Sequence, residues 1–314
     1  MSLGTSKVVI IGIGNVGKAL AHQLVIQQSC DELVLIDRAV DKVWAEVTDL
    51  NHSLGYADSR MKVYQGDYST CHDADIVVLS VSAPYKEGMT RLDMLDSATS
   101  IMKSIVPEVM KSGFKGIFVV ITNPVDVMTY LVHQLSKLPA KRVIGTGTSL
   151  DSARLRFYLA ELMGVDPRSV SALCMGEHGD TQMIPWSQVS VGSKKFYEIL
   201  EDNPQRLENI KVESIQKEIT QISYEVMLKK GATNYGIASV ASTIIRSIIK
   251  DINIVMPVSA QLNGEYGFND IFIGVPAVIG RSGIKELVSL NLTQDEYELF
   301  KKSAEMLKGI IKKL

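Results

Sequence analysis

The 314-residue chain is poor in cysteine: Cys30, Cys71 and Cys174 are its only three, and no two of them form a Cys-x-x-Cys pair. This odd and scattered set excludes a disulfide framework and favours reduced thiols, which are typical of cytoplasmic proteins. The sequence also lacks any apolar run near the roughly 20 residues that a membrane-spanning helix needs. Its N-terminus has no hydrophobic core of a secretory signal. We therefore expect a cytoplasmic protein without a membrane partner.

The sequence has no excess of charge of either sign. Its 33 Lys and Arg residues are balanced by 35 Asp and Glu residues, which gives a formal net charge of -2. A nucleic-acid-binding protein usually shows a basic stripe, so no nucleic-acid partner is expected. No convincing cluster of metal ligands stands out, and no metal is expected. The interspersed charges and the 46% of hydrophobic residues indicate one or two packed domains rather than disorder.

Short apolar segments rich in β-branched residues alternate with helical patterns in the first half of the chain. The segments predicted as strands are 7–13, 33–37, 61–65, 75–80 and 116–122. Helices are predicted between them, the first two over 16–28 and 40–53. This alternation is typical of an α/β fold with a Rossmann-type, doubly wound parallel sheet.

The pattern changes after about residue 145. Strand-like runs lie near 170–175, 188–192, 253–258 and 271–279, and helical patterns cover 149–163, 209–230, 236–251 and 293–313. Strands and helices no longer alternate regularly, which indicates an α+β architecture for the second half of the chain. We therefore predict two domains, one over 1–145 and the other over 146–314.

A dinucleotide-binding signature, Gly-x-Gly-x-x-Gly, follows the first predicted strand and opens the first predicted helix. The first glycine allows a tight turn, the second allows a pyrophosphate to approach the backbone, and the third allows helix and strand to pack closely. An acidic residue, Asp37, ends the second predicted strand, where it would accept the ribose hydroxyls and repel a 2′-phosphate. These features predict NAD as the cofactor, although Arg38 could recruit a 2′-phosphate. The predicted cofactor-binding residues of this region are Gly12, Gly14, Asn15, Val16, Gly17 and Asp37.

Two later segments carry the residues that chemistry on a 2-oxo acid needs. Asp151 and Arg154 are spaced i, i+3 in a predicted helix, so they share one face. Arginine suits a carboxylate because its planar fork donates two parallel hydrogen bonds. His178 lies in a glycine-rich loop, where the ring can be exposed, and a neighbouring carboxylate would favour its protonated form.

At these residues the sequence resembles the L-lactate and malate dehydrogenase family, and within it the bacterial L-lactate dehydrogenases most. The matching segments include Ile-Thr-Asn-Pro-Val-Asp and Gly-Glu-His-Gly-Asp-Thr, and they follow the order of the family over nearly the whole chain. They are 12–17, 90–93, 121–126, 150–156, 176–181, 231–237 and 274–280. The resemblance therefore rests on a set of motifs rather than on any one of them.

The resemblance implies that 1–145 is the NAD-binding domain and that 146–314 is the substrate-binding and catalytic domain, and it gives a role to each of these positions. It makes His178 the proton donor and acceptor, Asp151 the residue that orients it, and Arg154 the group that binds the substrate carboxylate. It places Arg91 at the end of a mobile lid over 82–90, where it would polarise the substrate carbonyl.

Three further residues take substrate or cofactor roles from the same resemblance. Asn123 would lie between the nicotinamide ribose and the substrate oxygen, although it could also be only a helix N-cap. Thr233 would line the substrate pocket, and Ile237 would pack on the nicotinamide ring.

The chain departs from the family pattern at two places. Lactate enzymes carry Gln, and malate enzymes Arg, six positions before the lid arginine, whereas this chain has Tyr85. Tyr85 is thus a candidate substrate-specificity residue, although it could simply face solvent. The family's fructose 1,6-bisphosphate site combines an arginine, here Arg156, with a histidine after Trp-Ser, where this chain has Gln188. Activation by this sugar phosphate is therefore doubtful.

The sequence predicts an L-lactate dehydrogenase that reduces pyruvate with NADH. An L-2-hydroxyisocaproate-type 2-hydroxy acid dehydrogenase or a malate dehydrogenase is the alternative. An NAD-dependent glycosidase would need a metal, and an NAD sensor would not need the four charged residues at 91, 151, 154 and 178. The resemblance also implies a homo-oligomer, either a homotetramer or a homodimer.

Overall fold

The computed structural model describes residues 5–58, 60–82, 91–203 and 212–314. The side chains of residues 91–94 and 213 also lie outside this description. The first half of the chain contributes six parallel strands, which are joined mostly by helices. The spatial order β3-β2-β1-β4-β5-β6 is that of a dinucleotide-binding doubly wound sheet. The strands are β1 (Lys7–Ile11), β2 (Glu32–Ile36), β3 (Lys62–Gln65), β4 (Ile76–Leu79), β5 (Ile117–Val120) and β6 (Val143–Gly145). The predicted fold class is confirmed.

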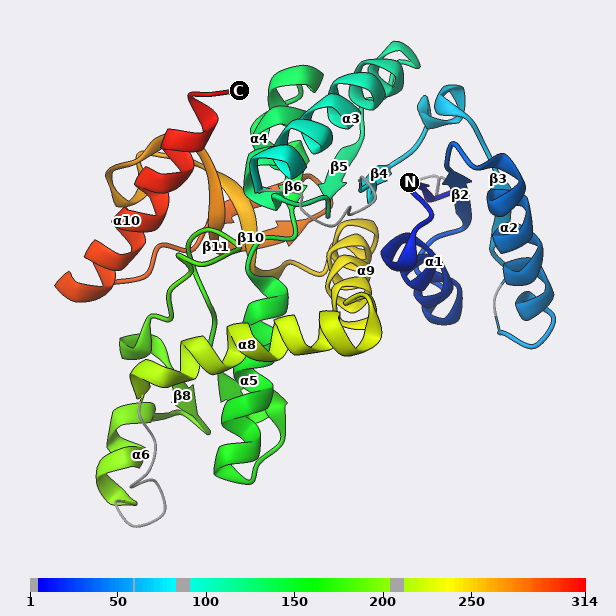
Figure 1. Ribbon diagram of the computed structural model, residues 1–314. Helices are drawn as coiled ribbons and strands as arrows, with labels where there is room; N and C mark the ends of the chain where they lie inside the picture. The colour runs from blue at the N-terminus through cyan, green and yellow to red at the C-terminus, as the bar shows by residue number, and fades with distance from the viewer. Residues whose placement is uncertain (1–4, 59, 83–90, 204–211) are drawn as a thin grey trace.

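Helices cover both faces of this sheet. The helices α1 (Asn15–Gln27) and α2 (Val40–Leu54) lie on one side of it, and α3 (Arg91–Lys111) and α4 (Val125–Ser136) lie on the other (Figure 1). Every residue of β1, β4 and β5 is buried. Strands covered on both faces need apolar side chains at successive positions, which explains the unbroken apolar runs in the sequence.

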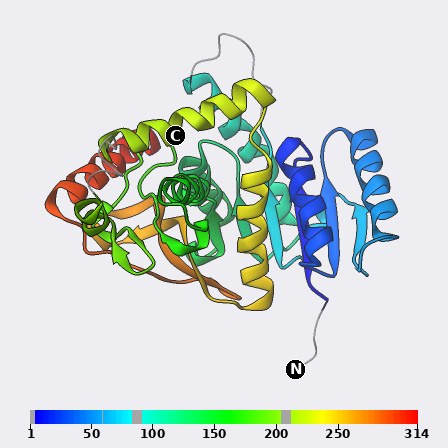
Figure 2. The same cartoon turned by 90° about the horizontal axis from the view of Figure 1, so that it is seen from below.

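The sheet continues into the second half of the chain through antiparallel strands. β10 (Ile254–Asn263) pairs with β6 at one position and with β11 (Asn269–Gly280) along most of its length, and β12 (Gly283–Leu287) forms the edge. One sheet of nine strands therefore crosses the boundary placed at residue 145, and the division into domains stays a prediction. The helix α9 (Tyr235–Lys250) lies beside α1, as Figures 1 and 2 both show.

A smaller body packs below the large sheet in the view of Figure 1. It contains α5 (Ser149–Met163), α6 (Phe196–Asp202), α8 (Val212–Lys230) and a sheet of β7 (Val170–Ser171), β8 (Ser190–Val191) and β9 (Lys194–Lys195). These elements share an apolar core that includes Leu159, Phe196 and Ile219. The last helix, α10 (Gln294–Ile311), starts with a capping box formed by Thr293 and Glu296. Short 3-10 turns are η1 (Tyr68–Cys71), η2 (Ala140–Arg142), η3 (Pro167–Ser169), η4 (Trp186–Gln188) and η5 (Glu265–Gly267).

Two predicted strands of this body are mostly wrong. Only Val170–Ser171 of the run 170–175 is a strand, and only Ser190–Val191 of the run 188–192. The backbone of Cys174 pairs with helix side chains instead of a neighbouring strand, since its N–H donates to Ser152 Oγ and its carbonyl accepts from Thr148 Oγ1. Residues 172–175 are therefore mostly buried but belong to no sheet, and Met175 forms only an isolated bridge with Met183.

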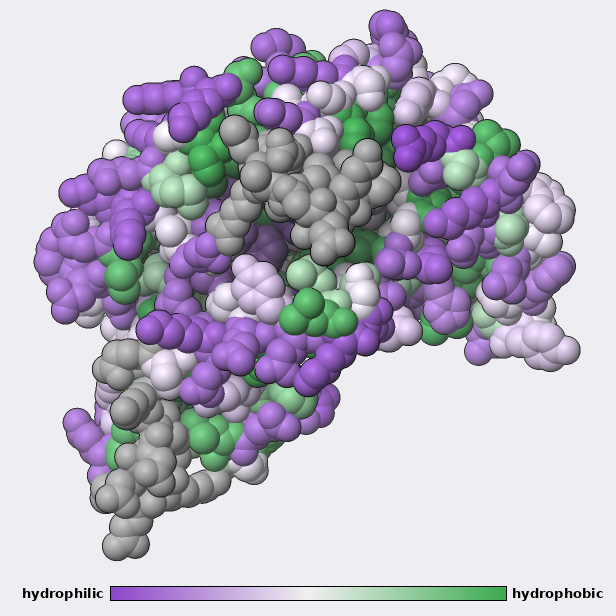
Figure 3. Space-filling model, viewed as in Figure 1, coloured by the Kyte–Doolittle hydropathy of each residue, from purple (hydrophilic) through white to green (hydrophobic). Residues whose placement is uncertain are grey.

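The surface contrasts with this interior. On the face shown in Figure 3, hydrophilic residues predominate, and apolar residues form small separate groups. Among the described residues, no helix combines the length and the apolar character that crossing a bilayer requires.

Candidate active site

The glycine loop after β1 is shaped for a phosphate group. Gly12 has φ of +98°, and a side chain there would run into the backbone of Ser80. A Cβ on Gly17 would overlap the carbonyl oxygen of Gly12, so only glycine lets α1 pack this closely on the loop. Open space surrounds the Cα of Gly14, where another group can approach the backbone.

The start of α1 adds hydrogen-bond donors to this loop. No side chain caps the helix, and its first turn holds no acidic residue. The first backbone N–H groups of a helix lack partners within the helix, and the helix dipole places partial positive charge beside them. The loop and the helix end together fit the pyrophosphate of a dinucleotide.

Asp37 lies directly after β2, beside the same loop. Its Oδ2 accepts the N–H of Ile13 at 2.8 Å, and its Oδ1 accepts the N–H of Ala39 at 3.0 Å. Each carboxylate oxygen has a second acceptor position, so the fixed carboxylate can still accept ribose hydroxyls. The geometry suits the adenosine end of NAD.

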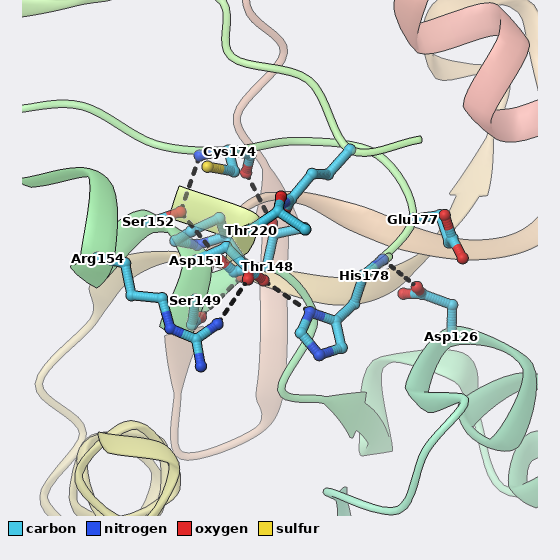
Figure 4. A network of polar contacts seen from close by, with 12 residues as sticks. Asp126, Thr148, Ser149, Asp151, Ser152, Arg154, Cys174, Glu177, His178 and Thr220 are labelled. Carbon is cyan, nitrogen blue, oxygen red and sulfur yellow. Dashed lines mark hydrogen bonds and ion pairs between the residues drawn. The ribbon is translucent and has the colours of Figure 1, made fainter. Parts of the chain in front are cut away.

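A cluster of three charged side chains lies at the start of α5. Asp151 lies in the first turn, and its Oδ2 forms a hydrogen bond with His178 Nδ1 at 2.6 Å. Its Oδ1 accepts a hydrogen bond from Arg154 Nη1 at 3.0 Å (Figure 4). The Asp151 side chain is 6% exposed, whereas 27% of the His178 side chain and 16% of the Arg154 side chain remain accessible. The aspartate is therefore hidden, and a small molecule can reach the imidazole and the guanidinium.

The surroundings of this cluster favour an ionised pair. Burial lowers the pKa of His178, but the charge of Asp151 and their hydrogen bond raise it by more in sum, so the pKa lies above its usual value. Burial raises the pKa of Asp151, but the charge and hydrogen bond of His178 and the charge of Arg154 outweigh it, so that pKa is lowered. The imidazole is thus held with a proton ready to donate, and Asp151 fixes Nδ1 as the inward nitrogen.

Contacts from distant parts of the chain hold the loop that carries His178. Gly176 forms a bridge with Gly274 of β11, and the N–H of Glu177 donates to Ser303 Oγ of α10 at 2.7 Å. The N–H of His178 itself donates to Asp126 Oδ2 of α4 at 2.8 Å. These contacts fix the backbone of the loop and with it the position of the His178 imidazole.

The cluster and the glycine loop share one edge of the sheet. The glycine loop follows β1, Asn123 follows β5, and only three residues separate the end of β6 from the start of α5. Thr122 Oγ1 donates to the carbonyl of Val81 after β4, which ties the ends of two neighbouring strands together. Ligands of open α/β sheets bind at this carboxyl edge.

The remaining sequence-predicted residues fall in different places. Asn123 is exposed after β5, and the alternative that it caps α4 is wrong, since Pro124 occupies the N-cap position and no side chain bonds there. Thr233 is half-buried just before α9, and Ile237 packs against the core from its first turn. Arg91 is the first residue of α3, but its side chain lies outside the described residues, as do Tyr85 and most of the predicted lid.

Sequence reasoning missed the residues that support the cluster. Asp126 belongs to the Asn-Pro-Val-Asp motif that carried part of the family resemblance, but it received no role. Thr148, Ser152 and Ser303 are small hydroxyl residues in helices or at their ends, where they have many ordinary uses. The one signal in the sequence is an acidic residue, Asp126, at the start of a predicted helix.

The described residues were also considered as possible ligands of a metal ion. Among the described residues, no group of three or more His, Cys, Asp and Glu side chains is placed to hold a metal ion. All three cysteines are free and buried.

Comparison with known proteins identifies the family. Residues 6–145 match the model of the lactate/malate dehydrogenase NAD-binding domain, and residues 148–314 match that of the lactate/malate dehydrogenase alpha/beta C-terminal domain. The chain belongs to the lactate/malate dehydrogenase family, as its motifs predicted, and it carries the NAD-binding domain of that family.

Similar proteins cover nearly the whole chain. L-lactate dehydrogenase 3 of Bacillus thuringiensis subsp. konkukian is 46% identical over 312 residues, which is 99% of either chain. L-lactate dehydrogenase of Macrococcus caseolyticus is 46% identical over 97% of this chain and 96% of its own. The crystal structure of minor L-lactate dehydrogenase from Enterococcus mundtii in its ligands-bound form has a TM-score of 0.95 at 41% identity, and it covers 99% of this chain and 98% of its own.

Proposed function

We propose that this chain is an NAD-dependent L-lactate dehydrogenase, which interconverts pyruvate and L-lactate by reversible hydride transfer. The observation that carries the proposal is the cluster of His178, Asp151 and Arg154 at the carboxyl edge of the dinucleotide-binding sheet. The relatives named as L-lactate dehydrogenases support pyruvate as the substrate.

His178 is the proton donor in this proposal. Asp151 occupies Nδ1, so Nε2 is the nitrogen that meets the substrate oxygen. NADH, held by the glycine loop and Asp37, would supply the hydride for the carbonyl carbon of pyruvate, and negative charge would then develop on the oxygen beside His178. The imidazolium stabilises that charge and then delivers its proton as a general acid. In the reverse direction the neutral imidazole takes the proton back.

Arg154 binds the substrate carboxylate. Its Nη1 is engaged by Asp151, which fixes the orientation of the guanidinium and leaves its other N–H groups available. A bidentate arginine–carboxylate pair aligns the substrate as well as holding it. The carbonyl next to that carboxylate is thereby held beside the imidazole.

Arg91, Asn123, Thr233 and Ile237 complete the proposed site. Arg91 would close with the lid and polarise the substrate carbonyl. Closure of such a lid excludes water and strengthens each charge interaction inside. Asn123 would contact the cofactor ribose and the substrate oxygen, Thr233 would line the pocket, and Ile237 would pack on the nicotinamide.

The glycine loop and Asp37 are the proposed NAD-binding residues. The loop and the uncapped start of α1 would hold the pyrophosphate, and Asp37 would hold the adenosine ribose. The members of the set are Gly12, Gly14, Asn15, Val16, Gly17 and Asp37, with Asn123 and Ile237 at the nicotinamide end.

A panel of 2-oxo acids tests the proposed function directly. The purified protein is mixed with NADH and each acid, and loss of NADH absorbance is followed. We expect pyruvate to be reduced with the highest kcat/KM. Faster reduction of oxaloacetate would indicate a malate dehydrogenase, and faster reduction of branched 2-oxo acids would indicate an L-2-hydroxyisocaproate-type enzyme. No turnover with any of them would refute the proposal.

We propose that Tyr85 alters or broadens the range of 2-oxo acids that the enzyme reduces. The Tyr85→Gln variant restores the side chain that lactate enzymes of the family carry, so the ratio of kcat/KM for pyruvate to that for longer 2-oxo acids should rise. A change of about tenfold corresponds to one or two lost contacts in a substrate pocket. An unchanged ratio would remove Tyr85 from the specificity argument.

Fructose 1,6-bisphosphate should activate this protein weakly or not at all. Gln188 takes the position of the family's histidine and donates its amide to the carbonyl of Asn291 and to Ser187 Oγ, both at 3.1 Å. A neutral amide with these partners offers a phosphate no charge. The pyruvate KM is measured with and without micromolar sugar phosphate, and a large drop in KM would contradict the expectation.

Two finer points belong to the same proposal. The enzyme would work as a homotetramer or a homodimer, and the exposed Trp44 on α2, 64% accessible, is a side chain that such an assembly would cover. It would reside in the cytoplasm, which the three free cysteines support.

A further inference from the structure

We infer that Asp126 is a positioning residue of the reaction, whose buried carboxylate anchors the backbone of His178 and supplies a second negative charge that keeps its imidazole protonated. This inference rests on the proposed function and deepens it. Asp126 does not touch substrate in this account, because it acts only through His178.

The geometry of Asp126 is unusual for a charged residue. It lies in the first turn of α4 and is only 1% exposed, and its Oδ2 accepts the His178 N–H at 2.8 Å. Its Oδ1 and the Oγ of Ser259 are buried without a partner of ordinary hydrogen-bond geometry among the described residues, although that hydroxyl lies near enough to lower the pKa of Asp126. Figure 4 shows the carboxylate beside the His178 backbone.

A hydrogen bond alone does not explain an acid at this position. The oxygen of an asparagine side chain could accept the same N–H, and it would avoid the cost of burying a charge. Burial raises the pKa of Asp126 to about 6, against the opposing effects of Ser259, the His178 N–H and the His178 charge. The carboxyl is therefore ionised at neutral pH at a cost in stability, so the charge itself needs a reason.

His178 supplies that reason. The described charged groups that act on its imidazole are Asp151 and Asp126, which raise its pKa, and Arg154, which lowers it. The charge of Glu177 acts on Asp126 and raises its pKa. Asp151 is shared between His178 and Arg154, so its charge is partly balanced by the guanidinium. The charge of Asp126 offsets the guanidinium and keeps the proton on His178 at the pH where pyruvate is reduced.

The Asp126→Asn variant separates the charge from the hydrogen bond. We expect the pH profile of kcat/KM for pyruvate to shift to lower pH, with a loss of roughly fivefold at pH 8 and a much smaller one at pH 6. NADH affinity should not change, because the glycine loop is untouched. Thr129→Val is the matched control, since Thr129 is fully buried in the same helix and its hydroxyl donates only to Val125 of its own helix.

The melting temperature of Asp126→Asn distinguishes the proposed role from a purely structural one, because the two roles predict changes of opposite sign. A carboxyl whose pKa is raised on folding binds its proton more tightly in the folded state, so its burial costs stability increasingly as pH rises from about 4 to about 6. Above that range the cost is complete. The Asp126→Asn variant should therefore melt higher than the native protein at pH 7.5, by about 2 °C or more, and the difference should shrink at pH 4.5. A lower Tm at pH 7.5 would mean that Asp126 serves only the fold.

Titration of His178 by NMR keeps this test independent of the proposed function. The Cε1–H signal of His178 should titrate at lower pH in Asp126→Asn than in the native protein, whether or not pyruvate is the substrate. An identical titration in the two proteins would overturn the inference, while lack of NADH oxidation by the native protein would overturn only the proposed function. If Asp126→Asn does not fold, Ser259→Ala raises the pH at which Asp126 takes up its proton and should shift the profile in the same direction.

Discussion

Replacing His178 by glutamine should lower kcat/KM for pyruvate reduction by about 10³-fold, because the reaction loses both its general acid and a positive charge beside the growing oxyanion. NADH binding should be unaffected. The native protein should lose activity as pH rises through the raised pKa of His178, since only the protonated imidazole can donate. The residual activity of His178→Gln should show no such decline, and lactate oxidation by the native protein should show the opposite dependence. Steady-state rates between pH 5.5 and 9 measure all three.

His72→Gln is the matched control for this variant. The His72 side chain is 62% exposed near η1, where it approaches Asp73 rather than the cluster. Its replacement should leave both the rate and the pH profile unchanged. Retention of more than a tenth of native activity in His178→Gln would remove the histidine from the proposed mechanism.

Replacing Arg154 by lysine should cost about 10²-fold in kcat/KM for pyruvate, mainly through KM. Lysine keeps the charge, but it cannot form the planar two-bond fork that aligns a carboxylate. The ion pair with Asp151 is mostly buried, so a weaker partner also leaves that carboxylate less well held. Saturation curves for pyruvate, together with the affinity for NADH, separate lost substrate binding from general damage.

Arg168→Lys provides the comparison. The Arg168 side chain is 92% exposed and pairs with Asp166 in a turn at the far end of α5, so the change should leave pyruvate kinetics as they are. Equal KM values for Arg154→Lys and the native protein would show that another group binds the carboxylate.

Much of the fold could be predicted because the buried strands of the parallel sheet appear in the sequence as short runs of apolar residues. Strands covered on both faces must be apolar at successive positions, as β4 and β5 are throughout and β1 is after its first residue, Lys7. The segment 172–175 before His178 could not be predicted in this way. It is as apolar as a strand, yet its backbone bonds to Thr148 and Ser152, and a sequence does not reveal which partner a buried backbone group will find.

The candidate site could be predicted only where its residues are close in sequence. Asp151 and Arg154 share a helical face by their spacing, and the structure joins them. His178 needed the family resemblance, since nothing local brings a loop residue to a helix 27 positions away. Asp126 is more distant still, 52 positions before its partner, and it escaped notice because only the folded chain shows that its carboxylate meets the His178 N–H.

A crystal structure of the protein with NADH and oxamate, an unreactive amide analogue of pyruvate, tests the central claim most directly. The account predicts His178 Nε2 within about 3 Å of the oxamate carbonyl oxygen and the Arg154 fork on its carboxylate, both next to the nicotinamide ring. An imidazole turned away from that ring, with Arg154 directed to solvent, would contradict it.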